Sequence, residues 1–134
     1  MVFGSPRYFK KHGRPRRPDD LRQHECIIRT AARDANAWPF TVDGRRKTVR
    51  VAGRLRTSSA LAANEAAAQG LGVANAPLWQ IQSLVARGDL ELVLARFEPP
   101  HVPVSAVWPA TNVPPAKTQL FIEFLAGRLK ATQL

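Results

Sequence analysis

The order of periodic segments in the second half of the chain is the feature that most restricts its fold. An alanine-rich helical segment at residues 61–69 follows three hydroxyl residues and ends at Gly70, in agreement with capping preferences. A strand-like segment at 71–76, a helical segment at 79–87 and alternating leucines at 90–94 come next. Because helices between strands return the chain for parallel pairing through right-handed crossovers, this order predicts an α/β fold.

The segments before residue 57 predict a short strand and a hairpin. An Asp-Gly dipeptide at 43–44 separates two β-type runs, 38–42 and 45–51, and such a dipeptide is the strongest short-range hairpin signal. Residues 26–28 are a short run with β-branched side chains, which predicts a strand. Residues 5–24 contain prolines and a glycine between short helical patterns, so we expect short helical pieces there.

The C-terminal segment predicts a strand and a helix that lack neighbours within this sequence. Residues 102–108 have a strand-like pattern, and residues 116–129 carry a broad apolar stripe at helical spacing. No strand-like segment follows this helix. We therefore expect the apolar stripe to be covered by another chain or by a segment outside this sequence.

Positive charge is concentrated in the first part of the chain. Residues 1–56 contain 15 Lys and Arg against five acidic residues, whereas residues 57–134 are balanced, and the net charge is +10. Six basic side chains lie between Arg7 and Arg17. Such a cluster suits a nucleic-acid contact or another anionic surface, and this is the alternative function. Aromatic residues do not alternate with the charges, so an ordinary solvated surface is the favoured interpretation.

Composition excludes several classes of protein. The single cysteine, Cys26, excludes an internal disulfide and a thiolate metal cluster, and its apolar neighbours indicate a small buried side chain. No catalytic or cofactor-binding motif is present, so we expect no enzyme, no cofactor and no metal. No apolar run is long enough to span a bilayer, and no secretory signal opens the chain. We therefore expect a cytoplasmic protein without membrane contact.

The candidate binding residues follow the predicted strands. Thr57, Ser58 and Ser59 stand between a strand and a helix, where carboxyl ends of parallel strands bind ligands and free helix N–H groups face anions. Trp79, shortly after the next strand, adds an aromatic side chain near the same edge. A simple helix cap for the hydroxyls, and simple packing for the tryptophan, are the alternatives that remain open.

Four stretches of the chain resemble LysR-type transcriptional regulators, in order and at fitting spacing. Residues 4–27, GSPRYFKKHGRPRRPDDLRQHECI, resemble their SPxYLxxHGxPxxPxDLxxHxCI stretch. Residues 49–79, VRVAGRLRTSSALAANEAAAQGLGVANAPLW, are similar to their strand–loop–helix–strand passage. VARGDLELVLARF, residues 85–97, and the C-terminal residues 102–129 are similar to two further segments of that family.

The resemblance implies a fold like that of type II periplasmic binding proteins, in which two α/β lobes clamp a ligand. Residues of about 6–100 would form the second lobe, and about 101–134 the crossing strand and C-terminal helix of the first lobe. The sheet for that helix would precede Met1. The chain would thus be a partial effector-binding domain that lacks the winged helix-turn-helix and the first part of lobe I.

The resemblance also implies a function and a binding site. The domain would sense a small, anionic effector, and DNA would be bound only by the N-terminal domain of the complete regulator. Ser5 and Pro6 at the first crossing, Thr57–Ser59 and Trp108 near the second crossing would line the site. Which hydroxyl faces the ligand stays open, because Thr-Ser-Ser replaces an Asn-Asp pair of many relatives. A homo-oligomer formed through the C-terminal helix is expected.

Overall fold

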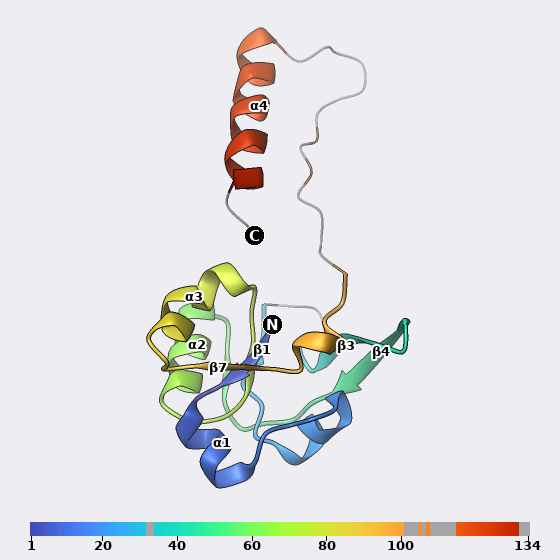
Figure 1. Cartoon of the computed structure of the whole chain (residues 1–134), viewed down its shortest axis with the longest axis vertical. Coiled ribbons are helices and arrows are strands. Elements are labelled where there is room, and N and C mark those ends of the chain that lie inside the picture. The colour runs from blue at the N-terminus through green and yellow to red at the C-terminus, as the bar shows by residue number, and fades with distance from the viewer. Residues whose placement is uncertain (32–33, 101–104, 106, 108–114, 132–134) are drawn as a thin grey trace. The chain divides into compact units, whose positions relative to one another are not determined.

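The computed structural model describes residues 1–31, 34–100, 105, 107 and 115–131, which belong to two compact units (Figure 1). Unit 1 is Met1–Pro100 and unit 2 is His101–Leu134. The elements of unit 1 are β1 (Val2–Gly4), α1 (Pro6–His12), the 3-10 helix η1 (Pro18–Gln23), β2 (Ile28–Arg29), β3 (Ala37–Val42), β4 (Arg45–Arg50), β5 (Arg56–Thr57), α2 (Ala60–Ala68), β6 (Ala74–Asn75), α3 (Leu78–Ala86), β7 (Glu91–Val93) and η2 (Ala95–Phe97). Unit 2 contains α4 (Ala116–Ala131).

Five strands of unit 1 form a three-stranded sheet and a two-stranded sheet, which a single bridge links. Strand β1 pairs antiparallel with both β6 and β7, and β2 pairs in parallel with β5. A parallel bridge between Cys26 and Val73 joins these two groups, with hydrogen bonds of 2.8 Å from the Ile27 N–H to the Val73 carbonyl and from the Val73 N–H to the Glu25 carbonyl. The strand order across the two linked sheets is therefore β5–β2–β6–β1–β7, and β1 runs against the other four strands.

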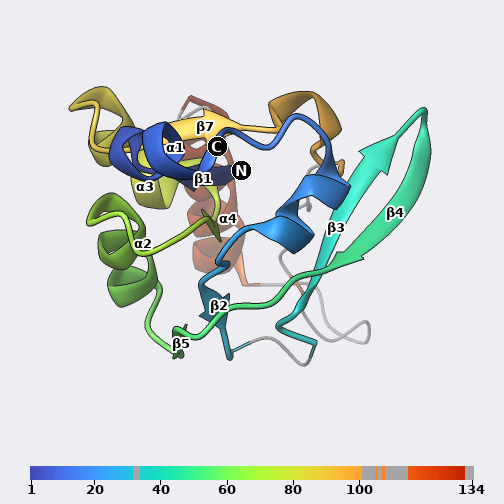
Figure 2. The same cartoon turned by 90° about the horizontal axis from the view of Figure 1, so that it is seen from below.

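Successive residues of the central strands contribute to two separate cores, one on each face of the sheet. Val2 and Ile28 belong to the core shared with α1, η1 and the β3–β4 hairpin. Phe3 and Ile27 belong to the core shared with α2 and α3. This alternation is what a pleated strand buried on both faces requires. Figure 2 shows α2 and the hairpin on opposite sides of unit 1.

The predicted hairpin is confirmed. Strands β3 and β4 pair from Ala37 opposite Arg50 to Val42 opposite Arg45. The two turn residues, Asp43 and Gly44, have φ angles of 49° and 72°. A two-residue turn with positive φ at both positions matches the right-handed twist of the strands, and Asp-Gly is well suited to it.

The predicted helices are also confirmed, with ends that differ by one or two residues. Ser59 caps α2 by accepting a hydrogen bond of 3.2 Å from the Ala62 N–H. Pro77 precedes α3, whose Ile81 is fully buried on the sheet side. The short helical pieces predicted before residue 24 are α1 and η1, and Pro18 begins η1 as expected for the first helical turn.

The sheet differs from the sequence prediction in one important respect. Strands β6 and β7 are parallel, but they do not pair, because β1 lies between them and pairs with both. Three residues after Met1 are too few to show a periodic pattern, so the sequence did not predict this strand. The strand predicted at residues 102–108 lies outside the described residues, apart from residues 105 and 107, which have no strand assignment.

Helix α4 of unit 2 presents its apolar side chains to solvent. Five large apolar side chains are exposed on it, by 39% to 66% of their surface: Leu120, Phe121, Phe124, Leu125 and Leu129. The described helices of the chain include none that is long and apolar enough to cross a membrane. The large apolar side chains of α4 are thus exposed within the described part of the chain.

Candidate functional site

The ends of three parallel strands bring the candidate residues to one edge of the sheet. We call this edge, formed by Arg29, Thr57–Ser59 and residues 75–79, the carboxyl edge. Arg29 at the end of β2 pairs with Thr57 at the end of β5. Helices α2 and α3 begin just after β5 and β6, so their first turns belong to the same edge. Open α/β sheets bind ligands at such an edge.

The three hydroxyl residues have different hydrogen bonds. The Thr57 Oγ1 accepts a hydrogen bond of 3.1 Å from the Ser59 N–H, and the Ser59 Oγ accepts the capping bond from Ala62. Within the described part of the chain, the exposed Ser58 hydroxyl has no hydrogen-bond partner. Because a hydroxyl that accepts still has its own proton to donate, all three residues have an O–H available for an acceptor group.

Arg29 is the residue at this edge that the sequence analysis missed. Its side chain is half-buried, and strand alternation relative to Ile27 places it on the sheet face that α2 covers. Among the described residues, no carboxylate pairs with its guanidinium group. A cation near the N-terminus of a helix repels the positive end of the helix dipole. An anion bound between the two would relieve that repulsion.

Trp79 lies at the carboxyl edge as the second residue of α3, and its side chain is 58% exposed. It follows Pro77, which ends the extended segment after β6. An indole with this exposure has not been used for core packing, so its face is available to an apolar or aromatic group. The aromatic residue and the hydroxyls therefore belong to neighbouring helix starts at one edge.

Two of the residues implied by the family resemblance lie at the opposite edge of the sheet. Because β1 runs antiparallel to β6, the residues that follow β1 approach the beginning of β6 rather than its end. Ser5 is 2% exposed and accepts a hydrogen bond of 3.2 Å from the Tyr8 N–H, so it caps α1, and Pro6 is the first residue of that helix. The Ser5 side chain also lies close to Gly70, because a Cβ atom on Gly70 would be 3.3 Å from the Ser5 Oγ. Trp108 lies outside the described residues.

Cys26 is a buried core residue, as the sequence predicted. Its side chain is 1% exposed, and burial raises the pKa of its thiol to about 12. A thiol with such a pKa is almost entirely protonated at neutral pH and is a poor nucleophile. Among the described residues, no group of three or more His, Cys, Asp or Glu side chains is placed to hold a metal ion.

Comparison with curated proteins identifies regulators of transcription. The chain is 27% identical over 134 residues to the probable HTH-type transcriptional regulator LtrA of Klebsiella pneumoniae, a match that covers 98% of this chain and 43% of that protein. It is 34% identical over 100 residues to a putative transcriptional regulator of Pseudomonas aeruginosa, covering 73% of this chain and 33% of the relative. The chain thus spans less than half the length of these relatives.

Comparison with solved structures identifies the fold. The CrgA regulatory domain of Neisseria meningitidis, a LysR-type transcriptional regulator, matches with a TM-score of 0.69 and 22% identity over 96% of this chain and 63% of that one. The full-length Vibrio cholerae virulence activator AphB matches with a TM-score of 0.64 and 23% identity over 72% of this chain and 33% of that one. The predicted type II periplasmic-binding-protein-like α/β fold is confirmed by these regulatory domains.

A family model extends the agreement to almost the whole chain. The model of the LysR substrate binding domain matches residues 1–130. This match includes the carboxyl edge of unit 1 and all of α4 except Ala131. The chain therefore belongs to the LysR substrate binding domain family.

Proposed function

We propose that unit 1 binds a small carboxylate-bearing effector at the carboxyl edge, as part of the sensor of a transcription regulator. The observation that supports this most strongly is Arg29, a half-buried cation without a carboxylate partner among the described residues. Arg29 pairs in the sheet with Thr57, and Thr57 lies three residues before the start of α2. A guanidinium group, hydroxyl donors and free helix N–H groups at one edge form a suitable environment for a carboxylate.

Each residue has a distinct part in the proposed complex. Arg29 binds the carboxylate through two parallel hydrogen bonds, and Ser58 donates its O–H to one of the same oxygens. Thr57 keeps the loop before α2 in shape through its bond to the Ser59 N–H. Trp79 covers the apolar part of the effector. The effector thus contacts strand β2, the loop before α2 and the first turn of α3.

The effector would act by shifting a population of conformations. In a two-lobed clamp, a ligand that contacts both lobes favours the closed arrangement by as much as its affinity differs between the two arrangements. We propose that this shift changes DNA binding by a separate domain of the complete regulator, in the cytoplasm. This chain would supply the sensing part only.

Replacing Arg29 with glutamine is expected to weaken carboxylate binding about 30-fold, which corresponds to the loss of a charge-assisted pair of about 2 kcal/mol. Ser58→Ala is expected to weaken binding about fivefold, the effect of one hydrogen bond of about 1 kcal/mol. Isothermal titration calorimetry with a panel of aliphatic and aromatic carboxylates measures both values. The matched control is Arg87→Gln, because Arg87 pairs with Asp89 just after α3 and away from the edge.

The control decides between a site and a general charge effect. An equal loss in Arg29→Gln and Arg87→Gln would show that only the net charge matters and would contradict the proposed site. Unchanged binding in Arg29→Gln would contradict it as well. The absence of a calorimetric signal with every carboxylate of the panel would also contradict the proposed site.

We also propose that this chain self-associates through α4. The exposed apolar side chains recur along one stripe, and members of this family form oligomers. Sedimentation equilibrium is expected to show a dimer for the chain and a monomer for the double variant Phe121→Glu/Phe124→Glu, because two charges in an apolar interface cannot be solvated. A monomer at high concentration for the unmodified chain would contradict this proposal.

A further inference from the structure

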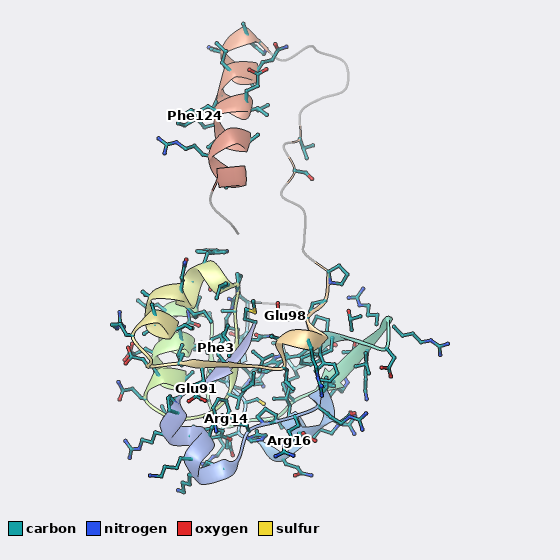
Figure 3. All side chains as sticks on the ribbon, in the orientation of Figure 1. Phe3, Arg14, Arg16, Glu91, Glu98 and Phe124 are labelled. Atoms are coloured by element: carbon teal, nitrogen blue, oxygen red, sulfur yellow. The ribbon has the colours of Figure 1, made fainter. Side chains whose placement is uncertain are left out.

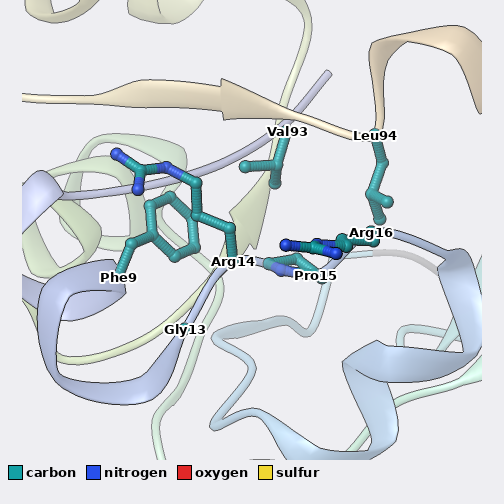
Figure 4. A pocket seen from close by; sticks show the side chains of 7 residues that line it. All are labelled: Phe9, Gly13, Arg14, Pro15, Arg16, Val93 and Leu94. Atoms are coloured by element: carbon teal, nitrogen blue, oxygen red, sulfur yellow. The ribbon is translucent and has the colours of Figure 1, made fainter.

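Two hollows lie side by side on unit 1, away from the carboxyl edge. The first has a volume of about 520 Å³ and is lined by Arg14 and Arg16 together with apolar side chains that include Phe9 and Val93 (Figure 4). The second has a volume of about 390 Å³ and is lined by residues of the hairpin turn together with Arg17, Arg96 and Phe97. Neither contains a residue of the carboxyl edge, so they are a separate feature of the molecule.

The two hollows are built from the same pair of chain segments. Residues 13–17, after α1, contribute to both, and so do residues 93–97, at the end of β7 and in η2. A hydrogen bond of 3.4 Å from the Arg96 guanidinium group to the Arg16 carbonyl holds the segments together. We call the combined surface, with Arg14, Arg16, Arg17 and Arg96 along it, the arginine groove.

The positive charge of the arginine groove is only partly compensated, by Glu91 at Arg14 and by Asp43, which lines the second hollow. Arg14 is paired with Glu91, with hydrogen bonds of 2.9 and 2.6 Å (Figure 3). Among the described residues, no carboxylate pairs with the guanidinium groups of the exposed Arg16, Arg17 and Arg96. Three like charges in one groove repel one another, and a bound polyanion would remove that repulsion.

Asp20, three residues after Arg17, bonds to the backbone of both arginines and also interacts with the charge of Arg17. The Asp20 carboxylate accepts hydrogen bonds of 2.8 and 2.9 Å from the N–H groups of Arg16 and Arg17. These two bonds are the main reason why the pKa of Asp20 is lowered. The side chains of the two arginines are therefore held on a fixed piece of backbone while their guanidinium groups stay available.

A strained residue shapes the opposite wall of the groove. Leu94 has a φ of 60° and a ψ of 19°, a left-handed conformation that is uncommon for a residue with a side chain. It turns the chain from β7 into η2, which brings Arg96 to the Arg16 carbonyl. Strain of this kind is concentrated at functional sites. It is an observation independent of the charge, and it concerns the same surface.

We propose that the arginine groove binds the phosphate backbone of duplex nucleic acid. Arg16, Arg17 and Arg96, which have no carboxylate partner among the described residues, lie along two open hollows, an arrangement that suits a row of phosphates better than one enclosed anion. The aromatic residues of the groove do not favour single strands, because Phe9 is buried and Phe97 is half-buried with the Arg96 guanidinium group over its ring at 4.7 Å. This contact is additional to effector binding and does not depend on it.

Salt dependence gives a quantitative test. Fluorescence anisotropy of a labelled duplex with the whole chain is expected to give a slope of about −2.7 in log affinity against log salt, for three phosphates neutralised, or about a 40-fold loss between 50 and 200 mM salt. The double variant Arg16→Gln/Arg17→Gln is expected to reduce the slope to about −0.9. A flat salt response of the unmodified chain would overturn the proposal.

The matched control removes the same charge elsewhere on the same segment. Lys10 and Lys11 are exposed in the last turn of α1 and line neither hollow. Lys10→Gln/Lys11→Gln is expected to keep the slope of the unmodified chain. Equal reductions in both double variants would overturn the groove. Full competition by inorganic phosphate or a mononucleotide at the concentration of duplex phosphates would identify a small-anion site and would overturn the duplex assignment.

Discussion

Replacing Phe3 with alanine is expected to lower the free energy of unfolding of the chain by about 4 kcal/mol. Phe3 is fully buried at the centre of β1, the strand that joins β6 and β7. Its ring fills the core between the sheet and the two covering helices, together with Ile81 and Leu90. Removing the ring loses its transfer free energy and leaves a cavity that rigid strands on both sides cannot close.

Urea unfolding followed by circular dichroism measures this loss. The control is Leu61→Ala, because Leu61 is 78% exposed on α2 and its removal leaves no cavity in the core. We expect the control to change the stability by less than about 1 kcal/mol. A loss below about 1 kcal/mol for Phe3→Ala would mean that β1 is not packed between β6 and β7.

Substituting Gly53 with alanine is expected to destabilise the fold by about 3 kcal/mol, although it adds a single methyl group. A Cβ atom at this position would lie 1.8 Å from the Cys26 carbonyl oxygen and 2.8 Å from the Cys26 nitrogen. Both are backbone atoms of the segment leading into β2, which cannot move without breaking the 2.9 Å hydrogen bond from the Cys26 N–H to the Ala52 carbonyl. The added methyl group would therefore push the segment before β5 away from the segment that leads into β2.

The same measurement with Gly127→Ala supplies the comparison. A Cβ atom on Gly127 meets nothing within 4 Å, and the residue lies inside α4, where alanine is a better helix former. We thus expect Gly53→Ala to lower the free energy of unfolding and Gly127→Ala to raise it. An unchanged stability in Gly53→Ala would show that the chain around Cys26 can yield and would contradict the close approach of these backbones.

The sequence predicted the elements whose signals are local. Asp43 and Gly44 specify their turn through their own φ angles, and Ser59 caps its helix within three residues. Strand β1 could not be predicted in this way, because its partners, β6 and β7, lie about 70 and 90 residues further along the chain. Val2–Gly4 forms a strand because it pairs with both β6 and β7, and only the tertiary structure brings these two partners to either side of it.

The candidate site was predictable only in part, for the same reason. The three hydroxyl residues 57–59 can be recognised in the sequence because they lie between a predicted strand and a predicted helix. The sequence does not distinguish Arg29, because it is one of many arginines in a basic segment. Only the structure shows that no carboxylate among the described residues pairs with it. The direction of β1 was also hidden, and it is this direction that places Ser5 at the opposite edge.

The fold places the basic residues between Arg7 and Arg17 in two separate groups. Arg7 and the two lysines belong to α1, whereas Arg14, Arg16 and Arg17 follow it and join Arg96 from the other end of unit 1. A count of charges along the sequence could not separate these two groups. Their separation is what makes the lysine control of the groove experiment possible.

A map of amide chemical shifts during carboxylate titration tests the central claim of effector binding at the carboxyl edge most directly. In nitrogen–proton correlation spectra of the isotope-labelled chain, we predict concentrated shifts at Arg29, in residues 57–61 and at the Trp79 indole N–H. Shifts confined to the neighbourhood of Ser5 and Pro6 would contradict the account, because that edge holds the other strand ends. A spectrum unchanged by every carboxylate tested would contradict it equally.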